Sequence, residues 1–419
     1  MKRILAIILT IAALACVVAL PAFAEEDHEP VTLRFAWWGS QTRNDQTLKV
    51  VEMFMEQYPW ITVECEYVGW DDYWDNLSVQ VASNEMPDVI QHDYRYLETY
   101  VNKGLLLPLD DYVGSVIDLS AVSDGVLTGG RVNDSLYGIP MGMNCFCTIY
   151  DETIFNEKGI EIPSYDWSYE DYLNVCSQFV EAGMYGCDLT NFEDIVLYQV
   201  RENDATLYAQ EGTGLGYEDD AIMEAIFQRR LDQVTNGQLP TPDVANQASG
   251  TEDSLIVRGE AAMVNYWSNA AASVANATDH VIKVTSYPGD VAKGSYIKPS
   301  MFISAAADTE HPDEAALLIE FFTNDLEANE IMMGERGVPI SATIREHITP
   351  MLDATTQSVF DLVDYISGVA APIDRPDPEG AGDVVSLLQE LEEELLYNQI
   401  TPAEAAARFR VEATDILEN

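Results

Sequence analysis

Residues 86–112, MPDVIQHDYRYLETYVNKGLLLPLDDY, predict a buried strand, a polar loop and a short helix in close succession. The strand is expected at Asp88-Val89-Ile90 and the loop at Gln91-His92-Asp93-Tyr94. A helix over residues 97–102 should follow and end at Gly104, before the apolar run LLLPL. In open α/β sheets, ligands bind at loops that leave the carboxyl ends of strands. The stretch therefore predicts an α/β protein whose site includes this loop.

The segments around this stretch continue the alternation of strands and helices. Residues 31–37, VTLRFAW, and residues 61–68 have the composition and alternation of strands. Between them, Leu48, Val51, Met55 and Tyr58 fall on one helical face until Pro59 ends the helix. Near the C-terminus, residues 315–322 form a second apolar helical stripe, and Thr401-Pro402-Ala403-Glu404 is a capping box. Strands separated by helices predict a parallel sheet with covered faces.

The N-terminus has the layout of a secretory signal. Lys2 and Arg3 precede an apolar stretch to about residue 20, and Ala22-Phe23-Ala24 is a small-residue cleavage site. We therefore expect residues 1–24 to be removed near Ala24 and the mature chain to be periplasmic or extracellular. Cys16 offers an alternative, since a lipidation cysteine would anchor the chain at the cell surface.

Length and charge restrict the function further. About 395 mature residues exceed what a single core usually organises, so two lobes are expected. The chain has 21 Lys+Arg and 71 Asp+Glu residues, which gives a formal net charge of −50. This charge argues against nucleic-acid backbones and anionic membranes as partners.

The sequence carries no recognisable catalytic or cofactor motif. It lacks H-E-x-x-H and G-x-S-x-G, and the glycines at 212–216 lack the spacing of a nucleotide loop. The cysteines after residue 24 show no zinc-site spacing. Cys176 and Cys187 could form a disulfide, and buried free thiols are the alternative. We predict no catalytic residue, metal or cofactor. The full set of these cysteines is Cys65, Cys145, Cys147, Cys176 and Cys187.

Six segments, read in order, resemble one family over nearly the whole mature chain. The chain is similar to family 1 of the extracellular solute-binding proteins of ABC importers, the carbohydrate-binding, maltose-binding-protein-like group. The segments are FAWWGSQ at 35–41, MPDVIQ to LLPLDDY at 86–112, LYGIPMGMNCFCTIYDETIF at 136–155, RGEAAMVNYWSNAA at 258–271, KPSMFISAAADTEHPDEAALLIEFFTND at 298–325 and ERGVPIS at 335–341.

The resemblance implies a periplasmic-binding-protein-like fold of type II, with two α/β lobes joined by a hinge that the chain crosses more than once. Glycines and prolines punctuate two of the expected crossings, as at Gly138, Pro140 and Pro288-Gly289. The expected ranges are 31–141 plus 295–338 for the N-lobe, 145–290 plus 343–419 for the C-lobe, and hinge segments near 140–144, 287–296 and 338–343.

The resemblance also places the site in a cleft between the lobes. A sugar ring needs aromatic planes for its C–H face and polar groups for its hydroxyls. Trp267 is the leading candidate because the segment before it resembles the family's strand that ends in a stacking residue. The full set of expected ligand contacts is Trp38, Gln41, Arg43, Trp70, Asp93, Tyr94, Asn144, Tyr266, Trp267, Met301 and Arg336.

The expected function is capture of a mono- or oligosaccharide by a monomer, followed by delivery to an ABC permease. Two alternatives stay open. The same fold could bind another solute, such as a polyamine, a metal complex or an acidic sugar. An acidic site with few amides would indicate a cation, whereas Arg43 and Arg336 turned into the site would indicate an acidic sugar. A secreted polysaccharide-active enzyme is the second alternative.

Overall fold

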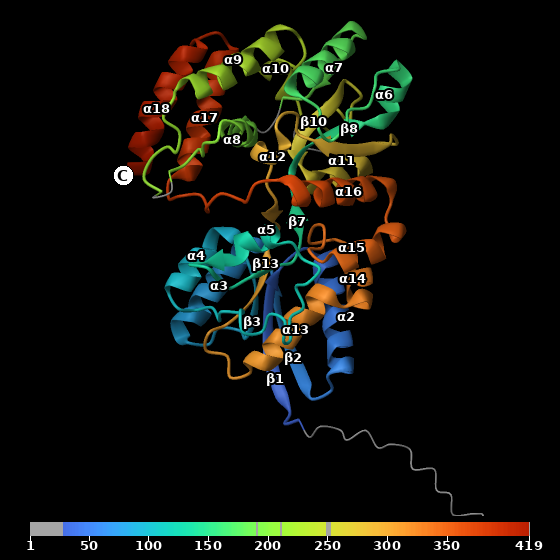
Figure 1. The fold of residues 1–419 in the computed structure, drawn as a ribbon, viewed down its shortest axis with the longest axis vertical. Coiled ribbons are helices and arrows are strands. Elements are labelled where there is room, and N and C mark those ends of the chain that lie inside the picture. The colour runs from blue at the N-terminus through green and yellow to red at the C-terminus, as the bar shows by residue number, and fades with distance from the viewer. Residues whose placement is uncertain (1–27, 190–191, 210–211, 249–252, 419) are drawn as a thin grey trace, which may run out of the picture.

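A computed structural model describes residues 28–189, 192–209, 212–248 and 253–418. The expected signal segment, its cleavage site and Cys16 lie outside these ranges. Figure 1 shows the chain arranged in two parts, one above the other, each built around its own sheet. The element order confirms the alternation of strands and helices that the sequence predicts.

The first sheet has the strand order β2-β1-β3-β13-β6. Strands β2 and β3 run parallel to β1, whereas β13 runs antiparallel to both β3 and β6. The late segment thus returns to a sheet that is otherwise built from the first 140 residues. The strands are β1 (Val31–Trp38), β2 (Ile61–Val68), β3 (Val89–His92), β6 (Ile139–Pro140) and β13 (Phe302–Ala305).

Helices cover both faces of this sheet, with α3 and α4 on one side and α2 and α14 on the other (Figure 1). Leu33, Phe35 and Trp37 of β1 are fully buried, and Phe35 meets Phe322 of α13 edge to face. The elements are α2 (Gln41–Gln57), α3 (Trp70–Ser83), α4 (Tyr94–Asn102), α5 (Asp124–Leu127), α13 (Pro312–Asn324), α14 (Leu326–Met332) and α15 (Ala342–Ile348), with a hairpin of β4 (Arg131–Val132) and β5 (Ser135–Leu136).

The second sheet has the order β11-β8-β10-β9, and every residue of its strand β8 is buried. Its strands are β8 (Phe146–Asp151), β9 (Tyr185–Cys187), β10 (Ala261–Trp267) and β11 (Ile282–Ser286). Its helices are α6 (Glu152–Lys158), α7 (Tyr169–Glu181), α8 (Phe192–Glu202), α9 (Ala221–Thr235), α10 (Pro242–Ala245), α11 (Ala271–Asn276), α12 (Val291–Gly294), α16 (Ala354–Val369), α17 (Ala381–Leu396) and α18 (Pro402–Glu418).

Three chain segments lie side by side between the two sheets. Strand β7 (Met143–Asn144) pairs with β12 (Lys298–Pro299), and Met143 also exchanges backbone hydrogen bonds of 2.8 and 3.1 Å with Val338. The second of these segments lies a few residues after the range 287–296 expected from sequence. The turn at Pro288-Gly289 instead packs within the second part, where Glu202 accepts a 2.6 Å hydrogen bond from Asp290 N.

Helix α15 lies beside α14 of the first part (Figure 1), although the resemblance placed residues 343–419 in the C-lobe. His347 Nε2 and Glu330 Oε1, 2.7 Å apart, join the two helices. The residue limits of the two lobes stay a prediction.

Cys145, Cys147, Cys176 and Cys187 are buried free thiols, so the structure has no disulfide between Cys176 and Cys187.

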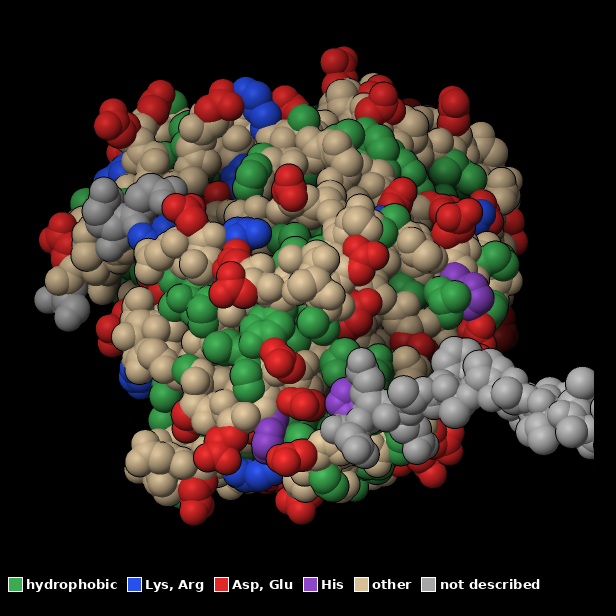
Figure 2. Space-filling view, turned by 60° about the horizontal axis from the view of Figure 1, so that its bottom comes forward, with side chains coloured by type: hydrophobic (Ala, Val, Ile, Leu, Met, Phe, Trp, Pro, Cys, Tyr) green, Lys and Arg blue, Asp and Glu red, His purple; other side chains and the backbone are tan. Residues whose placement is uncertain are grey.

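Figure 2 shows acidic side chains spread over the viewed face, with few basic ones among them. Within the described ranges, no helix is both long and apolar enough to cross a membrane.

Candidate functional site

A cavity of about 580 Å³ lies between the two sheets. Helix α4 contributes to one wall along its whole length, and the starts of α8 and α17 contribute to the other. The end of β10, the crossing at β12 and the extended segment 373–378 complete the lining. The cavity is thus formed by both parts of the molecule and by one of the segments that join them, which is the usual place for a ligand site.

Trp267 stands at the end of β10 with its ring in the lining. The indole Nε1 donates a 3.1 Å hydrogen bond to Asp194 Oδ2, and the ring of Tyr296 meets the indole edge to face at 5.8 Å. Lys298 Nζ lies 4.8 Å from the centre of the Trp267 ring. The hydrogen bond and the neighbouring ring hold the indole in place, so it can present its plane to a ligand.

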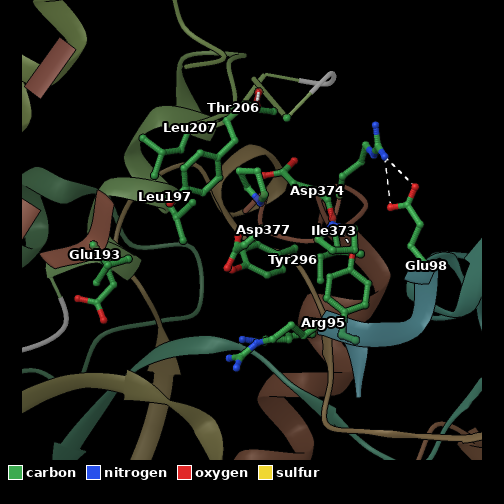
Figure 3. Close-up of a pocket in the computed structure, with 18 of the residues that line it drawn as sticks. Arg95, Glu98, Glu193, Leu197, Thr206, Leu207, Tyr296, Ile373, Asp374 and Asp377 are labelled. Atoms are coloured by element: carbon green, nitrogen blue, oxygen red, sulfur yellow. Dashed lines mark hydrogen bonds and ion pairs between the residues drawn. The ribbon is translucent and has the colours of Figure 1, made fainter. Parts of the chain in front are cut away.

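Carboxyl groups dominate the polar lining of the cavity. They belong to Asp93, Glu98, Glu193, Asp194, Asp374 and Asp377, whereas the lining cations are Arg95, Lys298 and Arg375. Burial and the neighbouring Glu193 raise the pKa of Asp194 to about 7, and Lys298 and the Trp267 hydrogen bond act against this rise. Figure 3 shows Asp377 and Tyr296 close together in the middle of the lining.

The extended segment between α16 and α17 runs across the gap between the two parts (Figure 1) and touches both of them. On the α4 side, Tyr94 Oη donates a 2.6 Å hydrogen bond to the Asp374 carbonyl, and Arg375 pairs with Glu98 at 3.0 Å (Figure 3). On the α8 side, the buried Arg201 donates to the Asp374 carboxylate and to the Pro372 carbonyl. The segment therefore closes one side of the cavity and couples its two walls.

The comparisons with known proteins agree on one family. Residues 49–392 match the sequence profile of the bacterial extracellular solute-binding proteins. The chain belongs to this family. Its resemblance to solute-binding proteins and its periplasmic-binding-protein-like fold, both inferred from the sequence, are confirmed.

Solved structures show the same fold as this solute-binding protein. A family 1 extracellular solute-binding protein from Alicyclobacillus acidocaldarius is 28% identical, with a TM-score of 0.86, and the match covers 94% of this chain and 100% of that one. A periplasmic oligogalacturonide-binding protein from Yersinia enterocolitica is 24% identical, with a TM-score of 0.76, over 92% and 99% of the two chains. Two designed esterases, 24% and 23% identical with TM-scores of 0.80 and 0.79, share the fold alone.

Among curated proteins, a candidate binding protein of Brucella abortus is 27% identical over 124 residues. This match spans 28% of the present chain and 29% of that relative. It therefore supports a binding role only over a short stretch, while the family profile and the structures cover most of the chain.

Three of the contacts predicted from sequence line the cavity of this solute-binding protein: Asp93, Tyr94 and Trp267. Asp93 also caps α4 by accepting a 2.9 Å hydrogen bond from Arg95 N. Ser300, next to the predicted Met301, lines the cavity too, while Met301 itself is buried in the core.

The two predicted tryptophans of the first part pack together away from the cavity lining. Trp38, at the end of β1, is 8% exposed and meets Trp70 edge to face at 4.9 Å. Trp70 begins α3 and is 37% exposed. The pair forms an aromatic cluster with Tyr73 and Trp74. The structure therefore does not bring these two rings to Trp267.

The two predicted arginines are held within the protein. The Arg43 guanidinium lies 2.9 Å from Glu335, and the fully buried Arg336 donates to Thr47 at 2.7 Å and to Gln91 at 3.2 Å. Burial and the nearby Arg43 lower the pKa of Arg336 to about 9. Both arginines therefore hold the first sheet and the third crossing together.

The remaining predicted contacts lie outside the lining. Gln41 is exposed and donates to Asp45. Asn144, on β7, accepts a 3.5 Å hydrogen bond from Ser268, and Tyr266 is half-buried on β10. Whether any of them touches ligand stays a prediction. The sequence reasoning missed three lining residues, Asp194, Tyr296 and Lys298. It also missed the segment 372–378, which lines the cavity from residue 373 on. The composition of this segment, rich in Pro and Asp, is the signal that could have marked it as extended.

Asp194→Asn is expected to stabilise the protein at pH 8 and to change little at pH 4. Folding raises the carboxyl pKa from its ordinary value of about 4 to about 7, so the folded state binds more protons between these pH values. The free energy of unfolding therefore falls as the pH rises from 4 to 7. The N-terminus of α8 stabilises the ionised carboxylate, and solvent screens its repulsion by neighbouring carboxylates. Both effects reduce the benefit of removing the charge, so we expect Asp194→Asn to raise the free energy of unfolding at pH 8 by only about 2 kcal/mol.

Calorimetric Tm values of the variant and the parent, recorded from pH 4 to pH 8, measure this effect. Asp45→Asn is the control, because it removes the same charge from an exposed site of α2. If the two variants change the Tm equally at every pH, the raised pKa of Asp194 is contradicted.

Proposed function

We propose that this chain captures a mono- or oligosaccharide in the cavity and delivers it to the membrane permease of an ABC importer. It would act as a monomer in the periplasm or at the cell surface. The observation that carries the proposal is Trp267, whose ring stands in a cavity that both parts of the molecule line. A rigid indole plane suits the C–H face of a sugar ring.

The polar lining suits the rim of hydroxyl groups around a sugar. An ionised carboxylate accepts hydrogen bonds at two oxygens, so one Asp or Glu can bind two vicinal hydroxyls. Asp93 supplies a carboxyl group from the first part, next to the phenol of Tyr94, and Asp194 supplies a carboxyl group from the second. The structural relatives support the class of ligand, since the Yersinia protein is described as binding oligogalacturonide and a Listeria monocytogenes relative is described in complex with cycloalternan.

The proposed mechanism is a hinged clamp. A ligand that touches both walls biases the protein toward the closed arrangement, because only that arrangement makes both sets of contacts. The segment 373–378 would contribute to the same equilibrium through Tyr94 and Glu98 on the opposite wall. The permease would then recognise the closed form.

Sugar binding is expected to raise the Tm of the mature protein by several degrees, because a ligand that binds only the native state stabilises it. The measurement is a thermal shift against neutral, amino and acidic mono- and oligosaccharides, with spermidine as a non-sugar cation. No shift with any sugar, together with a clear shift for spermidine, would overturn the carbohydrate assignment. Recovery of the bound sugar unchanged after long incubation separates a receptor from a polysaccharide-active enzyme.

A further inference from the structure

The charges around the cavity do not balance among the residues that the structure describes. The Glu98 carboxylate is paired with Arg375, and the Asp374 carboxylate with the buried Arg201. Four lining carboxyl groups then face two lining cations, and the carboxylates outnumber the cations even when Asp194, whose pKa is about 7, is protonated. The carboxyl groups are those of Asp93, Glu193, Asp194 and Asp377, and the cations are Arg95 and Lys298.

Part of this excess lies at Trp267. Asp194, Glu193 and Asp377 all line the cavity, and Glu193 and Asp377 both act to raise the pKa of Asp194. Asp194 in turn holds the Trp267 indole. A carboxylate cluster beside an aromatic face is a strong attractor for a positive charge, because the ring's own quadrupole also favours a cation over its face.

Two rings of the lining already carry cations over their faces. Lys298 Nζ lies over Trp267, and the Arg201 guanidinium carbon lies 4.9 Å from the centre of the Tyr296 ring. Arg201 is buried and fixed by Gly294, Pro372 and Asp374. Lys298, by contrast, is exposed and has a long flexible side chain. Its ammonium can move aside for a positive group of a ligand.

The lining offers few amides for a neutral or acidic sugar. Asn102 is the one amide side chain among the lining residues that the structure describes. Arg43 and Arg336, which would have indicated an acidic sugar, are held elsewhere. Carboxylates accept hydrogen bonds and attract cations but repel the carboxylates of a uronic acid.

We infer that the cavity takes a saccharide that bears an ammonium group, with the sugar ring stacked on Trp267 and the ammonium beside that ring, toward the lining carboxyl groups of Glu193, Asp194 and Asp377. This inference rests on the proposed sugar-binding function and narrows it to amino sugars. Further rings of an oligosaccharide would lie in the rest of the cavity, against the wall that Tyr94 and the segment 373–378 form. A uronic-acid oligosaccharide would be excluded.

Titration calorimetry at pH 6.5 with matched sugars tests the inference. The pairs are glucosamine and glucose, galactosamine and galactose, and the chitosan disaccharide and cellobiose, whose members differ mainly in an ammonium or a hydroxyl at carbon 2. We expect the amino member of at least one pair to bind about tenfold tighter than its neutral partner, and digalacturonate not to bind. Spermidine measures attraction of a cation without a sugar ring.

Charge variants give the second readout, which is the ratio of amino to neutral sugar affinity. Glu193→Gln and Asp377→Asn should each lower this ratio about tenfold, and Lys298→Gln should raise it. Glu64→Gln removes the same charge from an exposed position of β2 and should leave the ratio unchanged. Each cavity variant changes a single side chain at the surface of the cavity. Its Tm is compared with that of the parent to check that it folds.

The outcomes separate the inference from the function on which it rests. Equal or tighter binding of the neutral sugars, or tightest binding of digalacturonate, overturns the inference and leaves the sugar receptor in place. Binding of spermidine with no binding of any sugar overturns both. A preference for the amino sugar that all three cavity variants leave unchanged also overturns the inference, because the preference would then arise elsewhere.

Discussion

Trp267→Ala is expected to lower the affinity for the bound sugar about 100-fold. The ring lies in the cavity wall, and truncation of a tryptophan at the centre of a binding site commonly costs about 2–4 kcal/mol. The change also removes the indole that donates to Asp194 and that underlies the Lys298 ammonium. Titration calorimetry with the sugar that gives the largest thermal shift measures the loss.

Trp70→Ala and Trp267→Phe are the matched controls. Trp70 is a partly exposed tryptophan outside the cavity lining, so its truncation should leave the affinity within about threefold. Phenylalanine at 267 keeps an aromatic plane but loses the hydrogen bond to Asp194, and we expect an intermediate loss. A larger loss for Trp70→Ala than for Trp267→Ala would place the site at the Trp38 and Trp70 cluster instead.

The sequence predicts the elements of this fold because each of them has a local physical signal. The strands that begin at residues 31 and 61, the helix stop before Pro59 and the capping box at Thr401 all lie where the pattern placed them. The pairing of β13 with β3 and β6 has no local signal, since these strands are far apart in the chain. The resemblance to a family placed residues 295–338 in the same lobe as β3, but it did not predict this pairing.

The site was predictable to a smaller extent. Asp93, Tyr94 and Trp267 directly follow or end strands, and residues in such positions gather at one edge of a sheet. Asp194 and Asp377 lie on a helix and on an extended segment, which only tertiary packing brings to that edge. Arg43 and Arg336 show the opposite case, because a sequence cannot tell a guanidinium that faces ligand from one that binds Glu335, Thr47 or Gln91.

Gly142→Ala is expected to destabilise the protein by about 3 kcal/mol, because the three crossings meet at this residue. A Cβ atom at Gly142 would lie 2.1 Å from the Arg336 carbonyl oxygen, which belongs to buried backbone of the third crossing. The Gly142 carbonyl also accepts a 3.0 Å hydrogen bond from Ser300 N at the second crossing. The added methyl group must therefore push the crossings apart.

Calorimetry should show a Tm about 5 °C below that of the parent, and sugar affinity should fall as well, since the crossings set how the two walls of the cavity face each other. Gly368→Ala is the matched control. A Cβ atom at Gly368, near the end of α16, would meet no atom within 4 Å, and alanine favours a helix over glycine by up to about 1 kcal/mol. We therefore expect its Tm to be equal to or above that of the parent. If both variants keep the parent Tm and affinity, the contact between Gly142 and Arg336 does not hold the crossings in register.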